Sequence, residues 1–247
     1  MMTRTLMTTV LLAGSALAQV PAHQSPTAPA PVAVPKPPQD WAQLGRYAAE
    51  DAALPLPAPG QQRVVFLGDS ITDSWGRSVG SFFPGKPYVN RGISGQTTLQ
   101  MLVRFEQDVV HLHPVVVVIL AGTNDVAGNT GPETPTMIED NFRAMTDVAR
   151  RNGIRVVLAS ITPAARYPWR PGVESVPEIR DLNAWLKQYA AEQKLVYLDY
   201  YSAMADADGA MKPGLSSDGV HPTEAGYAVM APLAEAAIAQ ALKQERP

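Results

Sequence analysis

A serine, a histidine and an aspartate that together could transfer an acyl group lie in two short motifs far apart in the chain. Ser70 stands in a Gly-Asp-Ser turn, and Asp218 and His221 stand three residues apart in Asp-Gly-Val-His-Pro. A serine hydroxyl is a weak nucleophile until a neighbouring base takes its proton. The spacing lets Asp218 bond one imidazole nitrogen and leaves the other free for Ser70. The residue types therefore predict a triad that attacks an ester carbonyl.

Two further motifs supply hydrogen-bond donors for the oxyanion that such an attack creates. Gly92 lies in Asn-Arg-Gly-Ile-Ser-Gly, and Asn124 lies in Gly-Thr-Asn-Asp. The backbone N–H groups of Ser70 and Gly92 and the side-chain amide of Asn124 would form a three-donor oxyanion hole. Each such donor is worth about 10²–10³ in kcat. Taken singly, the residues have plainer interpretations, as helix caps or turn formers.

The elements around these motifs indicate one parallel sheet covered by helices. The predicted strands are Val64–Leu67, Tyr88–Asn90, Val115–Leu120, Val156–Ala159 and Val196–Leu198. The predicted helices are Leu99–Leu112, Thr136–Asn152, Ile179–Gln193 and a last stretch from Thr223 to Lys243, where Pro232 should give a kink or start a second helix. A short helix capped by Asp40 should run through Ala52. Five β-α repeats imply a doubly wound sheet, whose sites form at the carboxyl ends of the strands.

With these motifs in this order, the sequence resembles the GDSL, or SGNH, hydrolase superfamily over about residues 60–243. The marker residues correspond to Ser70, Gly92, Asn124 and His221, and the triad acid corresponds to Asp218. The resemblance implies a single-domain three-layer α/β/α sandwich of flavodoxin-like type, with a five-stranded parallel sheet of order 2-1-3-4-5. It also implies an acyl-enzyme mechanism that requires no metal and no cofactor.

The loop that follows the fourth predicted strand is the candidate for substrate binding. It carries Tyr167, Trp169 and Arg170 among prolines. Aromatic faces stack on sugar rings, and arginine bonds hydroxyl or carboxylate groups. A Trp169 packed under the loop is the structural alternative. Trp75 is a weaker candidate, and Asp73 would either cap the segment after Ser70 or face the ligand.

The resemblance to secreted GDSL esterases of the acetylxylan-esterase and acetylhydrolase types, together with this loop, predicts a short-chain esterase. Its substrate would be an acetyl ester on a carbohydrate, either a polysaccharide or a small molecule. A lysophospholipase or thioesterase of the same superfamily is the alternative, and a long acyl tunnel beside Ser70 would favour it. A glycan-binding module without catalysis is a more remote alternative, because no residue of the catalytic motifs is missing.

Composition excludes several other classes of protein. The 247 residues include no cysteine, which excludes disulfides, cysteine nucleophiles and thiolate metal sites. Apolar residues make up 46% and charged residues 17%, as expected for a chain with a sizeable core. The net charge of −3 argues against nucleic acid as a partner, since phosphate binding usually requires a basic surplus.

The N-terminal region has the pattern of a leader followed by a spacer. Residues 1–18 combine Arg4, an apolar run and an Ala-Leu-Ala site, which predicts a signal peptide cleaved between Ala18 and Gln19. Residues 19–39 are rich in proline and alanine and predict an extended linker. The hydrolase domain is then expected over residues 40–247. No later segment is predicted to span a membrane, so the protein is expected to be secreted or periplasmic.

Overall fold

The computed structural model describes residues 40–247, and the predicted leader (1–18) and linker (19–39) lie outside the described residues. Five parallel strands form one sheet in the order β2-β1-β3-β4-β5. The strands are β1 Val64–Gly68, β2 Tyr88–Gly92, β3 Val116–Leu120, β4 Arg155–Ala159 and β5 Val196–Leu198. Each predicted strand is found to within two residues. The predicted fold class and strand order are confirmed.

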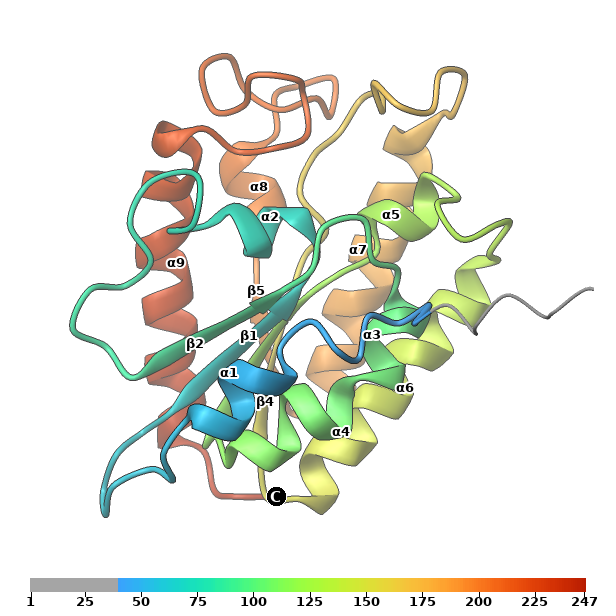
Figure 1. The fold of residues 1–247 in the computed structure, drawn as a ribbon. Coiled ribbons are helices and arrows are strands. Elements are labelled where there is room, and N and C mark those ends of the chain that lie inside the picture. The colour runs from blue at the N-terminus through green and yellow to red at the C-terminus, as the bar shows by residue number, and fades with distance from the viewer. Residues whose placement is uncertain (1–39) are drawn as a thin grey trace, which may run out of the picture. The chain divides into compact units, whose positions relative to one another are not determined.

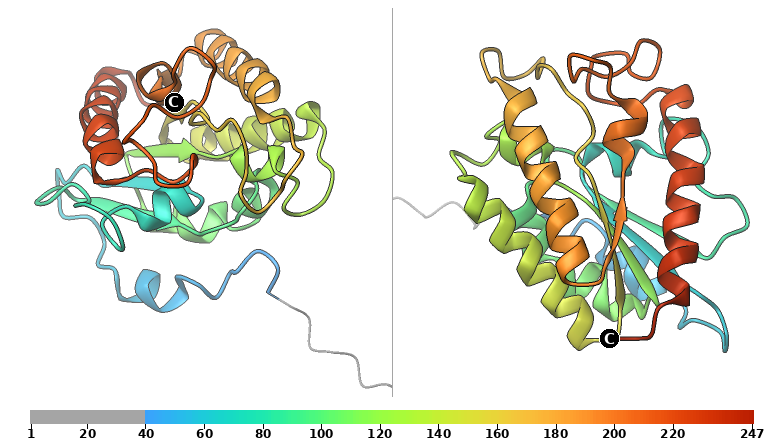
Figure 2. Two further views of the ribbon diagram at one scale, coloured as in Figure 1. Left: turned by 90° about the horizontal axis from the view of Figure 1, so that it is seen from above. Right: turned by 180° about the vertical axis from the view of Figure 1, so that it is seen from behind.

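Helices cover both faces of the sheet and make three layers (Figures 1 and 2). The helices are α1 Ala48–Ala53, α2 Ser70–Ser74, α3 Thr98–Val103, α4 Phe105–Asp108, α5 Thr123–Val126, α6 Pro135–Arg151, α7 Ser175–Glu192, α8 Tyr200–Met204 and α9 Glu224–Lys243, with a 3₁₀ turn η1 at Val110–Leu112. Alternate residues of β1 face opposite layers, because side chains alternate along a strand. Val65 and Leu67 pack under α3, α6 and α7, whereas Val64 and Phe66 pack under α8 and α9.

Several predicted helices differ from the prediction in their extent or continuity, and α7 begins four residues before the predicted Ile179. The stretch Leu99–Leu112 breaks into α3, α4 and η1, because Arg104 and Val109 leave the helical conformation. Arg104 turns its side chain into the interior. Asp40 accepts bonds from Leu44 and Gly45 N–H groups in a turn, and α1 begins only at Ala48. In contrast, α9 continues through Pro232 as one helix, so no second helix begins there.

Helix α9 departs in composition, though not in its packing, from the prediction that no later segment is long and apolar enough to span a membrane. Among the described residues it is the one helix long and apolar enough to do so. Its apolar face belongs to the core, because Tyr227, Met230, Ala234 and Ile238 are buried with residues of the sheet. Its apolar composition is therefore explained by its packing on the sheet.

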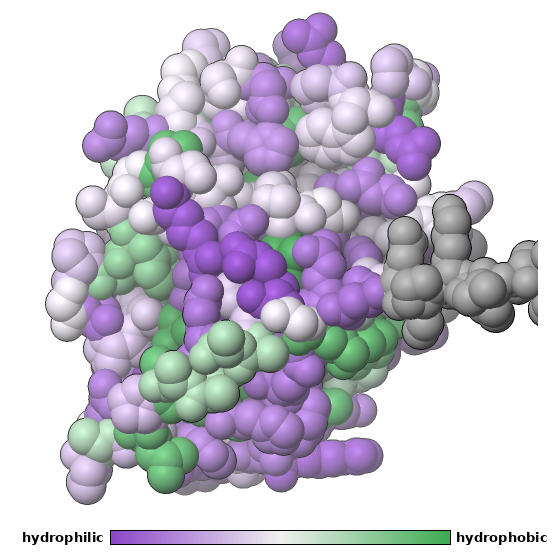
Figure 3. Space-filling model, viewed as in Figure 1, coloured by the Kyte–Doolittle hydropathy of each residue, from purple (hydrophilic) through white to green (hydrophobic). Residues whose placement is uncertain are grey.

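The N-terminal part of the described chain, residues 41–47, lies along α3 and α4 (Figure 1). Three glutamine side chains bind its backbone: Gln100 donates to Trp41 O, Gln96 to Ala42 O and Gln107 to Leu44 O. Trp41 and Leu44 remain partly exposed, and this face of the molecule mixes hydrophobic with hydrophilic residues (Figure 3). Hydrogen bonds to the backbone thus hold residues 41–44, and the fully buried Tyr47 anchors the end of the segment.

Candidate active site

Ser70 stands at the carboxyl end of β1 as the first residue of the short helix α2. Gly68 ends the strand, where a Cβ atom would collide with Thr72 and with Leu120 O. Asp69 caps α2 by accepting the N–H of Ile71 at 2.9 Å. Because the first N–H groups of a helix have no partner within it, the Ser70 N–H remains available beside its own hydroxyl.

The loop between α8 and α9 brings His221 and Asp218 to Ser70, 151 residues away in sequence. Ser70 Oγ lies 2.9 Å from His221 Nε2, and His221 Nδ1 lies 2.7 Å from Asp218 Oδ2. The carboxylate accepts only, so the Nδ1 proton points to Asp218 and Nε2 accepts from Ser70. Ser216, which sequence reasoning did not single out, donates to His221 O at 2.7 Å and steadies the loop.

The Asp218 carboxylate is held in its charged form. Its partial burial favours the neutral acid, but four hydrogen-bonding and charge contributions from His221 and Val220 outweigh this and lower the pKa of Asp218 to about 2. The other carboxylate oxygen, Oδ1, accepts the N–H groups of His221 at 2.8 Å and Val220 at 2.9 Å. Asp218 is therefore ionised throughout the range in which a histidine titrates, as an imidazolium partner must be.

A cavity of about 480 Å³ opens beside Ser70 Oγ. Four of the residues that line it were predicted from the sequence: Ser70, Asn124, Trp169 and His221. Four were not: Ser74, Ser94, Gly95 and Asn129. They come from the helices and loops that follow β1, β2, β3, β4 and α8, all at the carboxyl edge of the sheet. The cavity therefore forms where a doubly wound sheet places its ligands.

The structure corrects the predicted role of Gly92. Gly92 is buried and absent from the cavity wall, and its N–H donates to Asn90 Oδ1 at 2.9 Å. It is a glycine because β2 touches α2 here, where a Cβ would lie 2.1 Å from Asp73 N. Three residues later, Gly95 is exposed, lines the cavity and has a φ of +80°, which favours glycine. Gly95 replaces Gly92 as the backbone donor in our interpretation.

Asn124 is buried at the start of α5 with its amide oriented by two partners. Its Nδ2 donates to Gln96 O at 3.0 Å, and its Oδ1 accepts from Asn129 Nδ2 at 2.8 Å. An amide nitrogen carries two protons, so one remains to point into the cavity that Asn124 lines. The arrangement leaves Asn124 a donor at the position where the sequence predicted one.

The three predicted substrate-binding residues have different surroundings. Tyr167 is buried, 2% exposed, and its hydroxyl bonds Thr123 Oγ1, so its ring cannot meet a substrate. Arg170 is exposed but donates to Gly128 O at 2.8 Å and does not line the cavity. Only Trp169 does, with 39% of its surface exposed and its ring centroid 5.8 Å from that of His221. Tyr167 packs against Trp169 from below, with ring centroids 5.3 Å apart.

The two weaker candidates are structural. Trp75 is buried, stacks on Tyr227 and donates to Ser81 O. Asp73 neither caps α2 nor lines the cavity; its carboxylate accepts the Ser94 hydroxyl at 2.7 Å. This bond ties α2 to the loop that carries Gly95.

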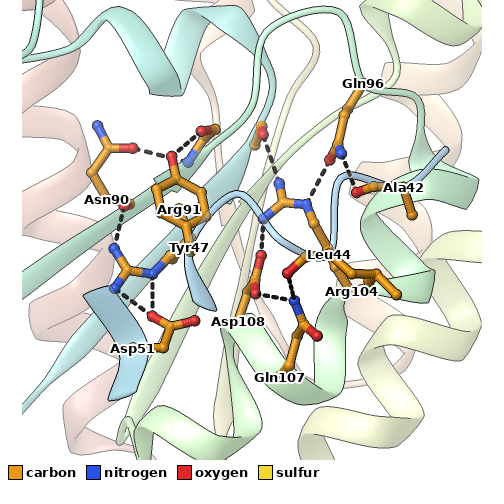
Figure 4. A network of polar contacts seen from close by, with 12 residues as sticks. Ala42, Leu44, Tyr47, Asp51, Asn90, Arg91, Gln96, Arg104, Gln107 and Asp108 are labelled. Carbon is orange, nitrogen blue, oxygen red and sulfur yellow. Dashed lines mark hydrogen bonds and ion pairs between the residues drawn. The ribbon is translucent and has the colours of Figure 1, made fainter. Parts of the chain in front are cut away.

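A buried polar network supports the loops from behind (Figure 4). The guanidinium of Arg104, fully buried, donates to Gly68 O at 3.0 Å, to Gln96 Oε1 at 2.5 Å and to Asp108 Oδ2 at 3.0 Å. It thus joins the turn before Ser70 to the residue after Gly95. Sequence reasoning missed Arg104, because an arginine within a helical pattern reads as a solvated residue.

The buried Asp69 carboxyl beside Ser70 should make the stability of the fold depend on pH. Burial opposes its charge and raises the pKa of Asp69 to about 6. Between pH 4 and pH 6 the folded state then binds more protons than the unfolded state, so stability falls as the pH rises. Asp69→Asn keeps an oxygen for Ile71 N–H and cannot ionise. Relative to wild type, its free energy of unfolding, measured by urea at pH 4 and pH 7, should rise by about 2 kcal/mol between the two pH values. If the difference in stability between Asp69→Asn and wild type were the same at pH 4 and pH 7, the raised pKa of Asp69 would be contradicted.

The fold and this geometry define a class. A serine hydroxyl bonded to a histidine, which is bonded to a carboxylate, at the loop edge of an α/β sheet and beside free amide donors, is the arrangement of serine hydrolases. The family model of the GDSL-like lipase/acylhydrolase family matches residues 66–229. The chain belongs to this family.

Individual relatives agree with this assignment. The chain is 29% identical over 203 residues to the acetylxylan esterase of Geobacillus stearothermophilus, covering 69% of this chain and 90% of that protein. It resembles the structure of a GDSL-like lipase from Bacteroides thetaiotaomicron VPI-5482, with a TM-score of 0.79 and 44% identity, over 81% of this chain and 98% of that one. A candidate acylhydrolase from Bacteroides fragilis NCTC 9343 is similar at a TM-score of 0.81 and 44% identity, over 83% and 100%.

Proposed function

We propose that the chain is a serine esterase that removes short acyl groups, acetyl above all, from a carbohydrate. His221 takes the proton of Ser70 as Oγ attacks the ester carbonyl. The N–H groups of Ser70 and Gly95 and the amide of Asn124 stabilise the oxyanion. His221 then protonates the leaving alcohol, and water releases the acyl group from Ser70 by the reverse roles.

The lining of the cavity is the observation that carries the preference for a short acyl group. Among its eight residues none is aliphatic, and Trp169 is the largest apolar side chain. A long acyl chain gains about 0.8 kcal/mol for each methylene that it buries against apolar groups. Serine, glycine and asparagine side chains offer little of that surface, so the lining favours acetyl esters over lipid esters and long-chain thioesters.

Trp169 supports a sugar as the alcohol half of the ester. Its ring lies at the cavity rim, near His221, which would protonate the leaving oxygen. A partly exposed indole there can stack on a sugar ring. The relative from Geobacillus stearothermophilus is named an acetylxylan esterase, which is consistent with this choice. The predicted leader would carry the enzyme out of the cytoplasm to such a polymer, so we extend the proposal to a secreted or periplasmic location.

Chain-length preference tests the proposal. We expect kcat/KM for p-nitrophenyl acetate to exceed that for p-nitrophenyl laurate by at least about tenfold, since the lining offers no aliphatic path. Acetylated xylooligosaccharide should then be deacetylated, and Ser70→Ala, run alongside, should not turn over either ester. Preference for laurate would replace the acetylesterase by a lipid esterase or thioesterase. Binding of the oligosaccharide without turnover of any ester would favour a glycan-binding module.

A further inference from the structure

Asn129 lies at the centre of a hydrogen-bonded chain that runs from the rim of the cavity to the oxyanion hole. Its Nδ2 donates to Asn124 Oδ1 at 2.8 Å and to Gly95 O at 3.3 Å. Its Oδ1 accepts from Trp169 Nε1 at 3.0 Å. The Asn129 amide thus contacts both Asn124 and Gly95, which are proposed to bind the oxyanion. It also contacts the Trp169 indole, which is proposed to bind the sugar.

The donors along this chain all point in one direction. An indole N–H can only donate, so Trp169 requires the oxygen of Asn129 on its side. The Asn129 nitrogen must then face Asn124, whose oxygen accepts it. Asn124 therefore presents its nitrogen to Gln96 O and to the cavity. Reversing either amide would bring two donors or two acceptors together, which buried polar groups avoid.

We propose that Asn129 is a positioning residue and that Trp169, Asn129 and Asn124 form a polarised relay, which we call the rim relay. The relay keeps the Asn124 amide turned with its N–H toward the oxyanion and links this orientation to the indole that meets the sugar. The inference rests on the proposed function and deepens it. A carbohydrate ester whose sugar lies on Trp169 would gain in kcat as well as in binding, because contact with the indole orders the oxyanion donor.

A simple tether between the loops does not account for Asn129. Arg170 Nη2 donates to Gly128 O at 2.8 Å and already joins the same two loops. Asn129 is half-buried, whereas Asn124 is 2% exposed. The two loops are already connected through Arg170, so what the Asn129 side chain adds is the orientation of the buried Asn124 amide.

Two asparagine variants separate polarity from shape. Asn129→Asp keeps the shape and still accepts from Trp169, but an ionised carboxylate cannot donate to Asn124. Asn129→Ala removes all three side-chain bonds of Asn129 and admits water. With p-nitrophenyl acetate at pH 8, we expect kcat to fall about tenfold for Asn129→Ala and about 100-fold for Asn129→Asp, with KM changed less than threefold. A shape or tether role predicts the reverse order, since the isosteric residue would then do less harm.

A second experiment examines the indole end of the relay. Trp169→Phe keeps an aromatic ring and removes the N–H, and should lower kcat about three- to tenfold. The double variant Trp169→Phe/Asn129→Ala should be no slower than Asn129→Ala, because both changes interrupt one chain. Arg170→Ala is the matched control: it cuts the neighbouring tether, leaves the relay intact and should retain kcat within about threefold.

The outcomes distinguish the relay from the function on which it rests. Thermal unfolding checks that each variant is folded. If Asn129→Asp does not fold, the cycle of Trp169→Phe, Asn129→Ala and their double variant tests the relay by itself. If Ser70→Ala hydrolyses the ester as fast as wild type, the proposed function fails. If turnover depends on Ser70 but Asn129→Asp equals or exceeds Asn129→Ala, or the double variant loses the product of both single effects, the relay alone is overturned.

Discussion

Replacing Ser70 by alanine is expected to lower kcat for p-nitrophenyl acetate by a factor of about 10⁴ or more. The reason is geometric: Ser70 Oγ is the hydroxyl that lies 2.9 Å from His221 Nε2. His221→Ala should lose a similar factor, and the double variant should lose little more, because the two residues act as one unit. Initial rates with active-site concentrations held equal provide the measurement.

Ser74 supplies the matched comparison for this prediction. Its hydroxyl belongs to the same helix and the same cavity wall as that of Ser70. It makes no hydrogen bond to His221 among the described residues. Ser74→Ala should therefore keep turnover within about tenfold of wild type, while a collapse equal to that of Ser70→Ala would mean that the nucleophile has been misassigned.

Asn124→Ala is expected to lower kcat by about 10²–10³, or about 3 to 4 kcal/mol of transition-state stabilisation. KM should change little, because the amide bonds the oxyanion more strongly than the ground-state carbonyl oxygen. Asn152→Ala, which removes a side-chain bond at the exposed end of α6, is the control and should match wild type. A loss seen mainly in KM would show that Asn124 binds substrate and transition state alike.

The sequence predicted the strands well because each is a run of apolar residues between turns. Val116–Leu120 is buried on both faces, which explains its unbroken valine, isoleucine and leucine residues. The motifs around Ser70 and His221 were also informative, since each follows a strand or precedes a helix and so must lie at the loop edge of the sheet. Local sequence was sufficient where position along a strand determines position in space.

Local sequence was insufficient where a role depends on contacts between distant loops. Gly92 ends β2 and Gly95 lies in the turn that follows. They differ because Gly92 touches α2, whereas Gly95 faces the cavity. Asn129 and Arg104 have no motif: an asparagine in a loop and an arginine in a helical pattern are ordinary residues. The role of Gly95 became visible only in the structure, where Gly95 lines the cavity and adjoins the buried Gln96, the partner of Asn124.

Tyr167 and Trp169 illustrate the same limit at the rim. The two aromatics are separated by one residue, yet one is buried and the other lines the cavity. The direction of each side chain is set by Thr123, which bonds Tyr167, and by Asn129, which bonds Trp169. Both partners belong to the segment after β3, and nothing in the sequence of the rim loop specifies them.

The most direct test of the central claim, that Ser70 is the nucleophile of an acyl transfer, is covalent trapping with a fluorophosphonate. The serine oxygen displaces fluoride from phosphorus, and His221 takes the hydroxyl proton. Three serines line the cavity, so the position of the adduct shows which of them is the nucleophile. Fragmentation of the tryptic peptide 64–77 distinguishes Ser70 from Ser74, and the peptide 92–104 reports on Ser94. The account predicts one adduct per chain, on Ser70, with loss of esterase activity in proportion. An adduct on Ser74 or Ser94, or full activity after complete labelling, would contradict it.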